Sequence, residues 1–387
     1  MDQKTLIGLF CQRPQNFAWF IGAGASRSAG LPTATDIIWD LKRRYYCQEE
    51  QQDLSRQDIQ SDAVKARIQE FLDSRGFPPP WAPEEYGTYF EKIFGVDHER
   101  QRRYLHGVLA EDKARLSVGN RVLGALLASG KCRVAFTTNF DSIVEKAVAE
   151  VSGRSLAAFH LEGSRAAVQA INNEEFPVYV KHHGDFRFEN LKNLPQDLAE
   201  QNEELAKAFV IAGARFGCIV AGYSGRDASV MRMFADALGG PNPFPHGLYW
   251  TRLGSSALSP AVHELLAKAR AKGVDAHEIV IETFDALMLR LWRAIEDKPR
   301  DLDAKVRKSH FTPANIPLPA MGTDRPIVRL NALPLIALPT ECNAVTFQAS
   351  KDWDDLRAAA RNAGRGLLLT KAETVWAWGG TLSLIHI

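Results

Sequence analysis

Four short polar segments, each following an apolar run, contain the residue types that could do chemistry. They read "GAGAS" (22–26), "TTNFD" (137–141), "KHHGD" (181–185) and "GYSGRD" (222–227). Between them they supply an asparagine amide, two imidazoles and several carboxylates, which proteins use to orient hydroxyl groups or water and to accept protons. If the apolar runs are parallel strands of one sheet, the four segments meet at its carboxyl edge, and we expect a site there.

The first segment places residues with small or no side chains at the end of a buried strand. Gly22, Ala23 and Gly24 would let a phosphate approach the backbone, and Ser26 with the amides that follow would bind it, helped by a helix that begins near Pro32. This is not the usual dinucleotide fingerprint, because an arginine stands where the third glycine belongs. A tight strand-to-helix turn without a ligand explains the segment equally well.

The second and third segments hold the groups suited to catalysis. Asn139 carries a donor and an acceptor in one rigid amide, which suits a ribose hydroxyl or an attacking water. His183, with an ordinary pKa of about 6.5, can take a proton at neutral pH. Side chains alternate along a strand, so we expect His182 to point the other way and to pack or to bond a backbone carbonyl. Asp141 either orients one of these groups or caps the helix that follows.

The elements that must position these residues have an alternating strand and helix pattern. Six short runs rich in β-branched and aromatic residues are predicted as buried parallel strands: 16–22, 132–139, 177–184, 216–224, 247–251 and 278–283. Amphipathic helices lie between them, for example one capped by Ser259 and ended by Gly273, and one capped by Thr283. The pattern predicts an α/β fold: a three-layer, Rossmann-like parallel sheet with helices on both faces.

Two stretches depart from this alternation. Residues 41–130 are too long for a simple crossover, and we expect an inserted helical subdomain there. We expect a catalytic domain over 1–300, a proline-rich linker over 301–326, and a fragment of a second domain over 327–387. Because the chain stops abruptly at "TLSLIHI", we expect this second, partial C-terminal domain to be truncated.

Composition excludes several classes of protein. The 387 residues include 47 Lys and Arg against 46 Asp and Glu, so no overall charge attracts nucleic acid or an anionic membrane. The five cysteines are scattered and form no C-x-x-C pair, which argues against a disulfide framework or a cysteine zinc site. We find no signal segment and no apolar run of membrane-spanning length, and expect a cytoplasmic protein.

The four segments, in this order, resemble the sirtuin-like superfamily, and its bacterial branch of NAD-degrading defence proteins more closely than its zinc-containing protein deacylases. The resemblance runs from about residue 17 to residue 295. It implies that Asn139, His183 and Asp141 form the catalytic group, the first and last of these in an Asn-x-Asp motif. It also implies that the NAD-binding residues are Gly22, Ala23, Gly24, Ser26, Thr138, Gly222 and Ser224.

Departures from the deacylases indicate the reaction. No cysteine stands between Gly184 and Gly217, where the deacylases carry their zinc module, and "GLPTATD" (30–36) replaces their Gly-x-Pro-Asp-Phe-Arg loop. We therefore expect that the protein binds no zinc and that water is the acceptor in the reaction. The expected activity is that of an NAD glycohydrolase (NAD+ nucleosidase), which cleaves NAD to nicotinamide and ADP-ribose and depletes cellular NAD in antiphage defence.

The resemblance also implies how such an enzyme is restrained. We expect a homo-oligomer, or a defence partner such as an Argonaute-like protein or a hexameric translocase, without direct nucleic-acid binding by the catalytic domain. Two other interpretations stay open. One is NAD-dependent ADP-ribosyl or acyl transfer on a macromolecule, and the other is a non-catalytic sensor of NAD or ADP-ribose. A sensor would need neither Asn139 nor His183.

Overall fold

In the computed structural model the chain divides into two compact units, Met1–Phe311 and Thr312–Ile387. In the first unit the structure describes residues 1–80, 82, 85–95, 97–109, 114–160, 164–182, 195–254 and 256–307. In the second it describes residues 343–345, 358, 360, 362, 366–369 and 375–378. Among the helices of these ranges, none combines the length and the apolar character needed to cross a bilayer.

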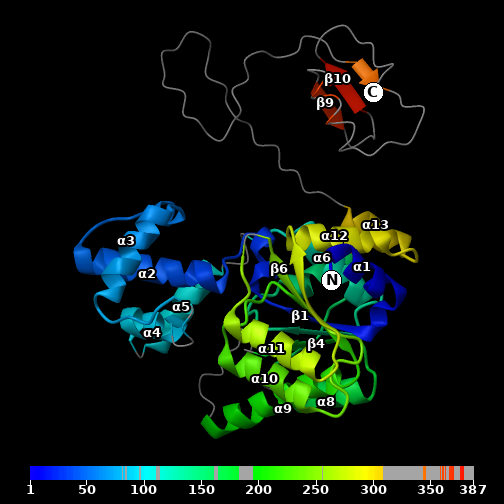
Figure 1. Ribbon diagram of the computed structural model, residues 1–387, viewed down its shortest axis with the longest axis horizontal. Helices are drawn as coiled ribbons and strands as arrows, with labels where there is room; N and C mark the ends of the chain where they lie inside the picture. Colours follow the sequence, from blue (N-terminus) through cyan, green and yellow to red (C-terminus); the bar gives the residue numbers. More distant parts are fainter. Residues whose placement is uncertain are drawn as a thin grey trace. The chain divides into compact units, whose positions relative to one another are not determined.

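A seven-stranded sheet, in which every strand pairs in parallel with its neighbours, forms the centre of the first unit (Figure 1). The strand order is β3-β4-β2-β1-β5-β6-β7. The strands are β1 (Phe17–Ile21), β2 (Val134–Thr137), β3 (Ala158–Phe159), β4 (Val178–Lys181), β5 (Gly217–Ala221), β6 (Leu248–Leu253) and β7 (Ala276–Ile281). All six predicted strands are confirmed, and the two-residue β3 is an addition.

Helices cover both faces of this sheet, which confirms the predicted three-layer, Rossmann-like α/β fold (Figure 1). Alternation along β1 sends Trp19 and Ile21 into one core and Ala18 and Phe20 into the other. The first core is covered by α1 (Gln3–Gln12), α6 (Val118–Ala128), α7 (Ile143–Ser152), α12 (Phe284–Ala294) and α13 (Arg300–Val306). The second is covered by α8 (Ser164–Asn172), α9 (Pro195–Gly213), α10 (Ala228–Gly239) and α11 (Pro260–Ala271).

The predicted helix caps are confirmed where the structure describes them. Ser259 accepts a hydrogen bond from the backbone of Val262 at the start of α11, and Thr283 accepts one from Ala286 at the start of α12. Gly273 has a φ of 81° just after α11, the left-handed conformation that ends a helix at low cost in glycine. Local sequence therefore fixes these helix ends.

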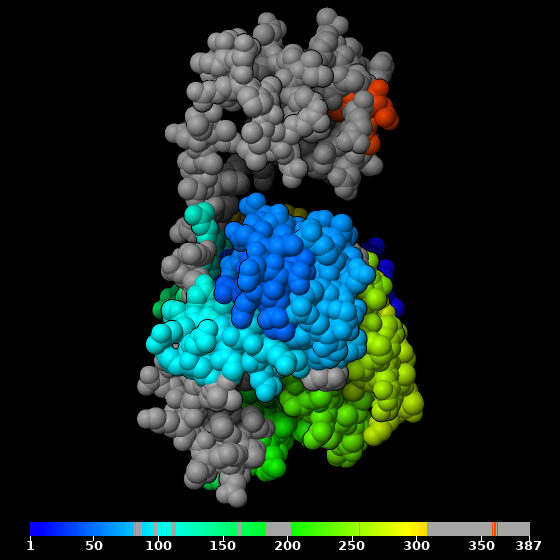
Figure 2. Space-filling model, turned by 90° about the vertical axis from the view of Figure 1, so that its left-hand side faces the viewer, coloured from blue at the N-terminus to red at the C-terminus, as the bar shows by residue number. Residues whose placement is uncertain are grey.

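The helical insertion has its own core. It contains α2 (Ala34–Glu50), α3 (Asp62–Asp73), α4 (Glu85–Phe94) and α5 (His98–Val108). Figure 2 views it from its outer side, in blue and cyan. The predicted bounds 41–130 differ from these, because α2 begins at Ala34 and α6 packs against the sheet rather than within the insertion. The polar pattern of the preceding residues concealed the change of core at α6.

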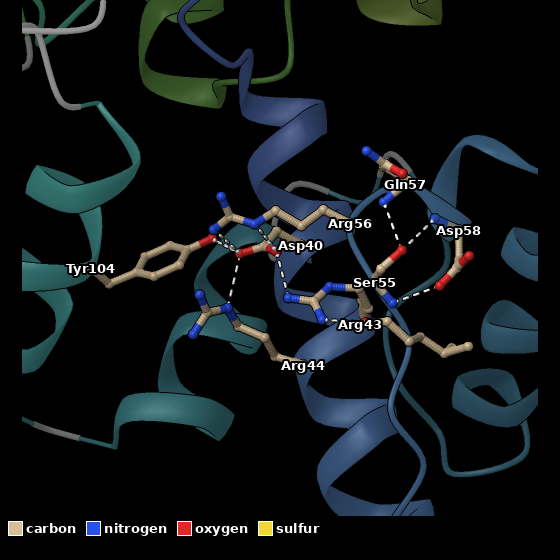
Figure 3. A network of polar contacts seen from close by, with 9 residues as sticks. Asp40, Arg43, Arg44, Ser55, Arg56, Gln57, Asp58 and Tyr104 are labelled. Carbon is tan, nitrogen blue, oxygen red and sulfur yellow. Dashed lines mark hydrogen bonds and ion pairs between the residues drawn. The ribbon is translucent and has the colours of Figure 1, made fainter. Parts of the chain in front are cut away.

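The carboxylate of Asp40 connects the parts of the insertion (Figure 3). It accepts hydrogen bonds from Arg43, Arg44 and Arg56 at 2.9 to 3.2 Å and from the hydroxyl of Tyr104 at 2.8 Å. Burial alone would raise the pKa of Asp40, but the hydrogen bonds from Arg56, Arg43, Tyr104 and Arg44 outweigh burial and hold that pKa well below its ordinary value. Asp40 therefore joins α2, α5 and the segment after α2.

The boundary between the units differs from the predicted linker. Residues 300–306 form α13, whose Leu302 and Val306 are buried in the first core, so this part of the predicted linker belongs to the first unit. The i, i+4 spacing of the two side chains places them on one helix face. In the second unit, β8 (Asn343–Val345), β10 (Val375–Trp378) and β9 (Gly366–Leu369) pair antiparallel in that order. Most of the predicted linker lies outside the described residues.

Candidate active site

The register of the sheet brings the four polar segments to one level. Ile21 pairs with Thr137 on one side and with Ala221 on the other, and Thr137 pairs with Lys181. These four residues form a row across adjacent parallel strands β4, β2, β1 and β5. Each polar segment begins in this row or one residue past it, so their predicted convergence at one sheet edge follows from the strand pairing.

The glycines of the first and fourth segments contact one another. A Cβ on Gly24 would lie 2.9 Å from the Cα of Gly222, and a Cβ on Gly22 would overlap the carbonyl oxygen of Gly222. The Gly24 N–H donates to that carbonyl at 2.8 Å. The neighbouring backbone therefore makes the close approach that the sequence assigned to a phosphate. These glycines are required by packing, and their role in binding NAD remains a prediction.

Asn139 and Ser26 meet across β1 and β2. The Asn139 Nδ2 donates to the Ser26 Oγ at 3.2 Å, and the Asn139 backbone N–H donates to the Thr137 Oγ1 at 3.0 Å. Both side chains are buried, with Asn139 6% and Ser26 3% exposed. The Asn139 Oδ1 is buried and has no hydrogen-bond partner among the described residues. The amide is thus held at its nitrogen and has an acceptor to offer to a hydroxyl or a water.

Asp141 bonds to the first turn of the helix that follows it, although Ser142 occupies the N-cap position. Its Oδ1 accepts a hydrogen bond from the backbone of Ile143, the first residue of α7, at 3.1 Å. Of the two interpretations that the sequence left open, capping therefore has a contact in the structure. The catalytic role of Asp141 stays a prediction.

Lys181, the last residue of β4, lies at the site without having been predicted for it. Its side chain is 0% exposed, and its ammonium donates to the carbonyl of Asp141 at 2.7 Å, to that of Phe140 at 3.4 Å and to the carboxylate of Glu145 at 3.2 Å. Burial raises the pKa of Glu145, although the charge of Lys181 opposes the rise. The signal that could have revealed Lys181 is a lysine at the last position of an apolar run that is otherwise fully buried.

Of the two adjacent histidines, the structure describes only His182. His182 is buried against the rings of Phe20 and Phe136, stacked on both with centroids 6.2 and 5.6 Å away, and its backbone N–H donates to the carbonyl of Thr137. The predicted packing of His182 is thus confirmed. His183 lies outside the described residues, so its catalytic role stays a prediction.

The segment after β5 is mostly accounted for by structural contacts. Tyr223 packs against Phe20 and Trp250, and Asp227 caps α10 by accepting a hydrogen bond from the backbone N–H of Ser229 at 2.9 Å. Ser224 is exposed at the sheet edge. Thr138, in the second segment, is half-buried and its N–H donates to the carbonyl of Ile21. The predicted binding roles of Ser224 and Thr138 stay predictions.

Arg226 connects this segment to the insertion. Its ion-pair partner, Glu85 of α4, is 2% exposed and lies 2.8 Å away. The other oxygen of Glu85 accepts from Lys42 of α2 at 2.7 Å, and Lys42 is 1% exposed. Lys42 also donates to Gln69 and lies 4.7 Å from the ring of Trp39. This Lys42–Glu85–Arg226 group is a buried ionic contact between the insertion and the candidate site.

The helix after the first segment differs from the expectation. Between Ser26 and the helix the chain makes a 3-10 turn (Arg27–Ala29) and a left-handed residue, Gly30. α2 begins at Ala34, and its first turn is closed by a capping box between Thr33 and Asp36. A first turn capped by its own side chains has fewer amides left for a phosphate, and the contribution of this helix end to phosphate binding stays a prediction.

Within the described ranges, no group of three or more His, Cys, Asp or Glu side chains is arranged to hold a metal ion.

A doubly wound parallel sheet with polar loops at its carboxyl edge defines a Rossmann-like α/β protein. Residues 133–276 match the family model described as a SIR2-like domain. The matched range runs from the residue before β2 to the first residue of β7, so it contains Asn139, Asp141 and Gly222 but not the segment 22–26. The match supports the resemblance to the sirtuin-like superfamily over that range.

No match was found among curated proteins. Among solved structures, a Sir2 enzyme studied for mechanism and regulation is 12% identical, with 76% of this chain and 96% of that chain covered and a TM-score of 0.37. A Sir2 mutant with a p53 peptide and NAD is 13% identical, with 76% and 98% covered and a TM-score of 0.36.

Proposed function

We propose that the chain is a sirtuin-like NAD glycohydrolase, which hydrolyses NAD to nicotinamide and ADP-ribose. The observation that carries the proposal is the buried amide of Asn139, held at its nitrogen by Ser26 and unpartnered at its oxygen among the described residues. A buried acceptor without a partner costs free energy unless a ligand or a water satisfies it. This amide lies in the range that matches a SIR2-like domain, which supports NAD as the ligand.

The proposed reaction needs few protein groups. The bond from the ribose to nicotinamide breaks and a bond from the ribose to a water oxygen forms, with one proton released. Asn139 would accept a hydrogen bond through Oδ1 from a ribose hydroxyl or from the water and so orient it. His183 would take the proton from the ribose hydroxyl or the water, a contribution typically worth about 10²–10⁴ in rate.

Hydrolysis is favoured over deacylation by what the sequence lacks. The protein deacylases of the superfamily have a zinc module of two C-x-x-C pairs, whereas no cysteine stands between residues 184 and 217 here. Without that module the acyl-lysine cleft would lose one wall. Water is then the acceptor that remains.

Chromatography of NAD incubated with the purified full chain tests the proposal. Wild type should release nicotinamide and ADP-ribose, and Asn139→Ala and His183→Ala should each lower the rate about 10²-fold or more. The matched controls are Asn173→Ala and His263→Ala, since both residues are exposed and lie outside the four segments. Equal rates in wild type and Asn139→Ala would contradict the proposal. Label from NAD on a macromolecule, with no free ADP-ribose, would replace hydrolysis by transfer.

The proposal includes a role in antiphage defence. An enzyme that consumes NAD stops an infected cell, and it has to be restrained before infection, by self-assembly or by an Argonaute-like or hexameric translocase partner. NAD should fall on infection in cells that express the wild-type chain and stay constant in cells that express Asn139→Ala. Constant NAD in both would contradict the role.

A further inference from the structure

Lys181 is a buried charge at the candidate site that the proposed reaction does not use. Its side chain is 0% exposed. An ammonium group is costly to remove from water unless hydrogen bonds satisfy its donors. The partners of Lys181 therefore indicate why it is there.

Two of its bonds go to the backbone just after Asn139. The ammonium donates to the carbonyl of Asp141 at 2.7 Å and to that of Phe140 at 3.4 Å. The reach follows from the register, because Lys181 pairs with Thr137, two residues before Asn139. The next strand thus holds the peptide groups that follow the amide.

An ordinary buried ion pair with Glu145 is the alternative explanation. The contact to Glu145 is longer, at 3.2 Å, than the contact to the Asp141 carbonyl. The second carboxylate oxygen of Glu145 is buried without a hydrogen-bond partner among the described residues. A pair built for stability alone would satisfy that oxygen, because an unpaired buried acceptor is costly. Among the described partners of the ammonium, the geometry favours the backbone carbonyls over Glu145.

We propose that Lys181 is a positioning residue, which fixes the orientation of the Asn139 amide by holding the carbonyls of Phe140 and Asp141. The inference rests on the proposed function for its effect on catalysis. Asn139 is then held at three points: Ser26 holds its side-chain nitrogen, Thr137 holds its backbone N–H, and Lys181 holds the peptides that follow. Its Oδ1 is left with one fixed direction.

The test compares three variants of the full chain. Lys181→Met removes the ammonium but leaves Glu145 as an unpaired buried charge, which can unfold a protein. The double variant Lys181→Met/Glu145→Gln removes both charges and avoids that penalty. Glu145→Gln alone is the matched control, since it ends the ion pair and leaves the bonds from Lys181 to the carbonyls in place.

The first measurement does not depend on activity. In protein labelled with ¹⁵N-asparagine, the side-chain amide signal of Asn139 is identified by its loss in Asn139→Ala. In the double variant this signal should shift toward the chemical shift of exposed asparagine amides. Its hydrogens should exchange with solvent about tenfold faster, which corresponds to the loss of about one hydrogen bond. In Glu145→Gln it should stay in place. An unchanged signal in the double variant would overturn the proposal.

The second measurement is the kinetics of NAD cleavage. The double variant should lower kcat about 10²-fold, the cost of misplacing a reacting group by about 1 Å, with KM for NAD unchanged. A loss of the same size in Glu145→Gln would show that the ion pair matters and would overturn the proposal. If wild type cleaves no NAD, the proposed function fails, while the amide signal still decides the role of Lys181.

Discussion

Gly222 combines two features that only glycine tolerates well. Its φ is 71°, in the left-handed region, and a Cβ there would overlap the backbone nitrogen of Ala25 and lie 2.9 Å from the carbonyl carbon of Gly24. The loops after β1 and β5 can approach each other only because neither has a side chain at this point.

We expect Gly222→Ala to lower the free energy of unfolding by about 2–5 kcal/mol, from overpacking of about 1–3 kcal/mol and a left-handed conformation of about 1–2 kcal/mol. Urea unfolding followed by circular dichroism measures the change. Gly8→Ala is the control, because Gly8 is exposed in α1 with no atom within 4 Å of its Cβ position, and it should gain up to about 1 kcal/mol. Equal stability of both variants would disprove the packing argument.

At this scale the residue types of the site were predictable and their contacts were not. Ser26 and Asn139 were both predicted for the site, from different segments, yet their hydrogen bond joins positions 113 residues apart and depends on the register of β1 and β2. The row of paired strand ends could not be predicted residue by residue, because register is set by packing of the whole sheet. Lys181 was missed because a lysine at a strand end is usually solvated.

Among the elements, the insertion shows how one carboxylate can organise several helices. Asp40 of α2 receives donors from its own helix, from the segment after it and from α5 (Figure 3). Three of these donors are arginines, which stay charged at every pH of interest. Without the carboxylate they would repel one another, so the arrangement of the insertion depends on Asp40.

We expect Asp40→Asn to lower the stability of the insertion by about 1–3 kcal/mol, the cost of replacing a buried charged acceptor that receives four side-chain donors. Amide hydrogen exchange should accelerate in α2, α3 and α5 and stay unchanged in the strands of the sheet. Asp53→Asn, at an exposed position, is the control. Uniform acceleration over the sheet as well would show that Asp40 serves the whole unit.

The pH dependence of this effect has a defined sign. The pKa of Asp40 is lowered in the folded state, so its contribution is fully present above the unfolded value, about 3.9, and is lost as pH falls toward the folded value. The difference in exchange between wild type and Asp40→Asn should therefore be constant at neutral pH and shrink below about pH 4. A difference that grew on acidification would contradict the assignment.

Elements with a strong period were predictable, and short or tertiary ones were not. The apolar run of β1 and the caps of α11 and α12 contain their own signals, and the structure has them where the sequence predicts. β3 has two residues, too few for any pattern. α6 fell inside the predicted insertion because the residues before it have a polar helical pattern, and only packing shows that α6 belongs to the first core.

For the whole molecule, the first unit contains complete cores. The four clusters of buried apolar side chains draw on residues from Leu6 to Val306, and none includes a described residue of the second unit. The predicted domain of 1–300 stops short of Leu302 and Val306, which close the first core. The pattern of strands predicted the sheet, but the last helix needed coordinates, because a charged segment beside prolines looks like a linker.

We expect a fragment ending at residue 311 to unfold at the same temperature as the first unit of the full chain. A fragment ending at residue 298 should lose about 3–6 kcal/mol, since burying a leucine or a valine contributes about 1.5–3 kcal/mol each. It also loses the hydrogen bond from Trp292 to Asp303 at 2.8 Å. Calorimetry distinguishes the two, and equal melting temperatures would show that α13 adds nothing.

Glu85 compensates the charge of a guanidinium that belongs to another part of the chain. Arg226 follows the glycine loop of β5, yet the anion that neutralises it comes from α4, together with Lys42 from α2. A minimal version of the protein, trimmed to the sheet and its covering helices, would leave Arg226 without its anionic partner Glu85. An engineered version of this kind also has to replace Arg226, because an ion pair connects the helical insertion to the domain that carries it.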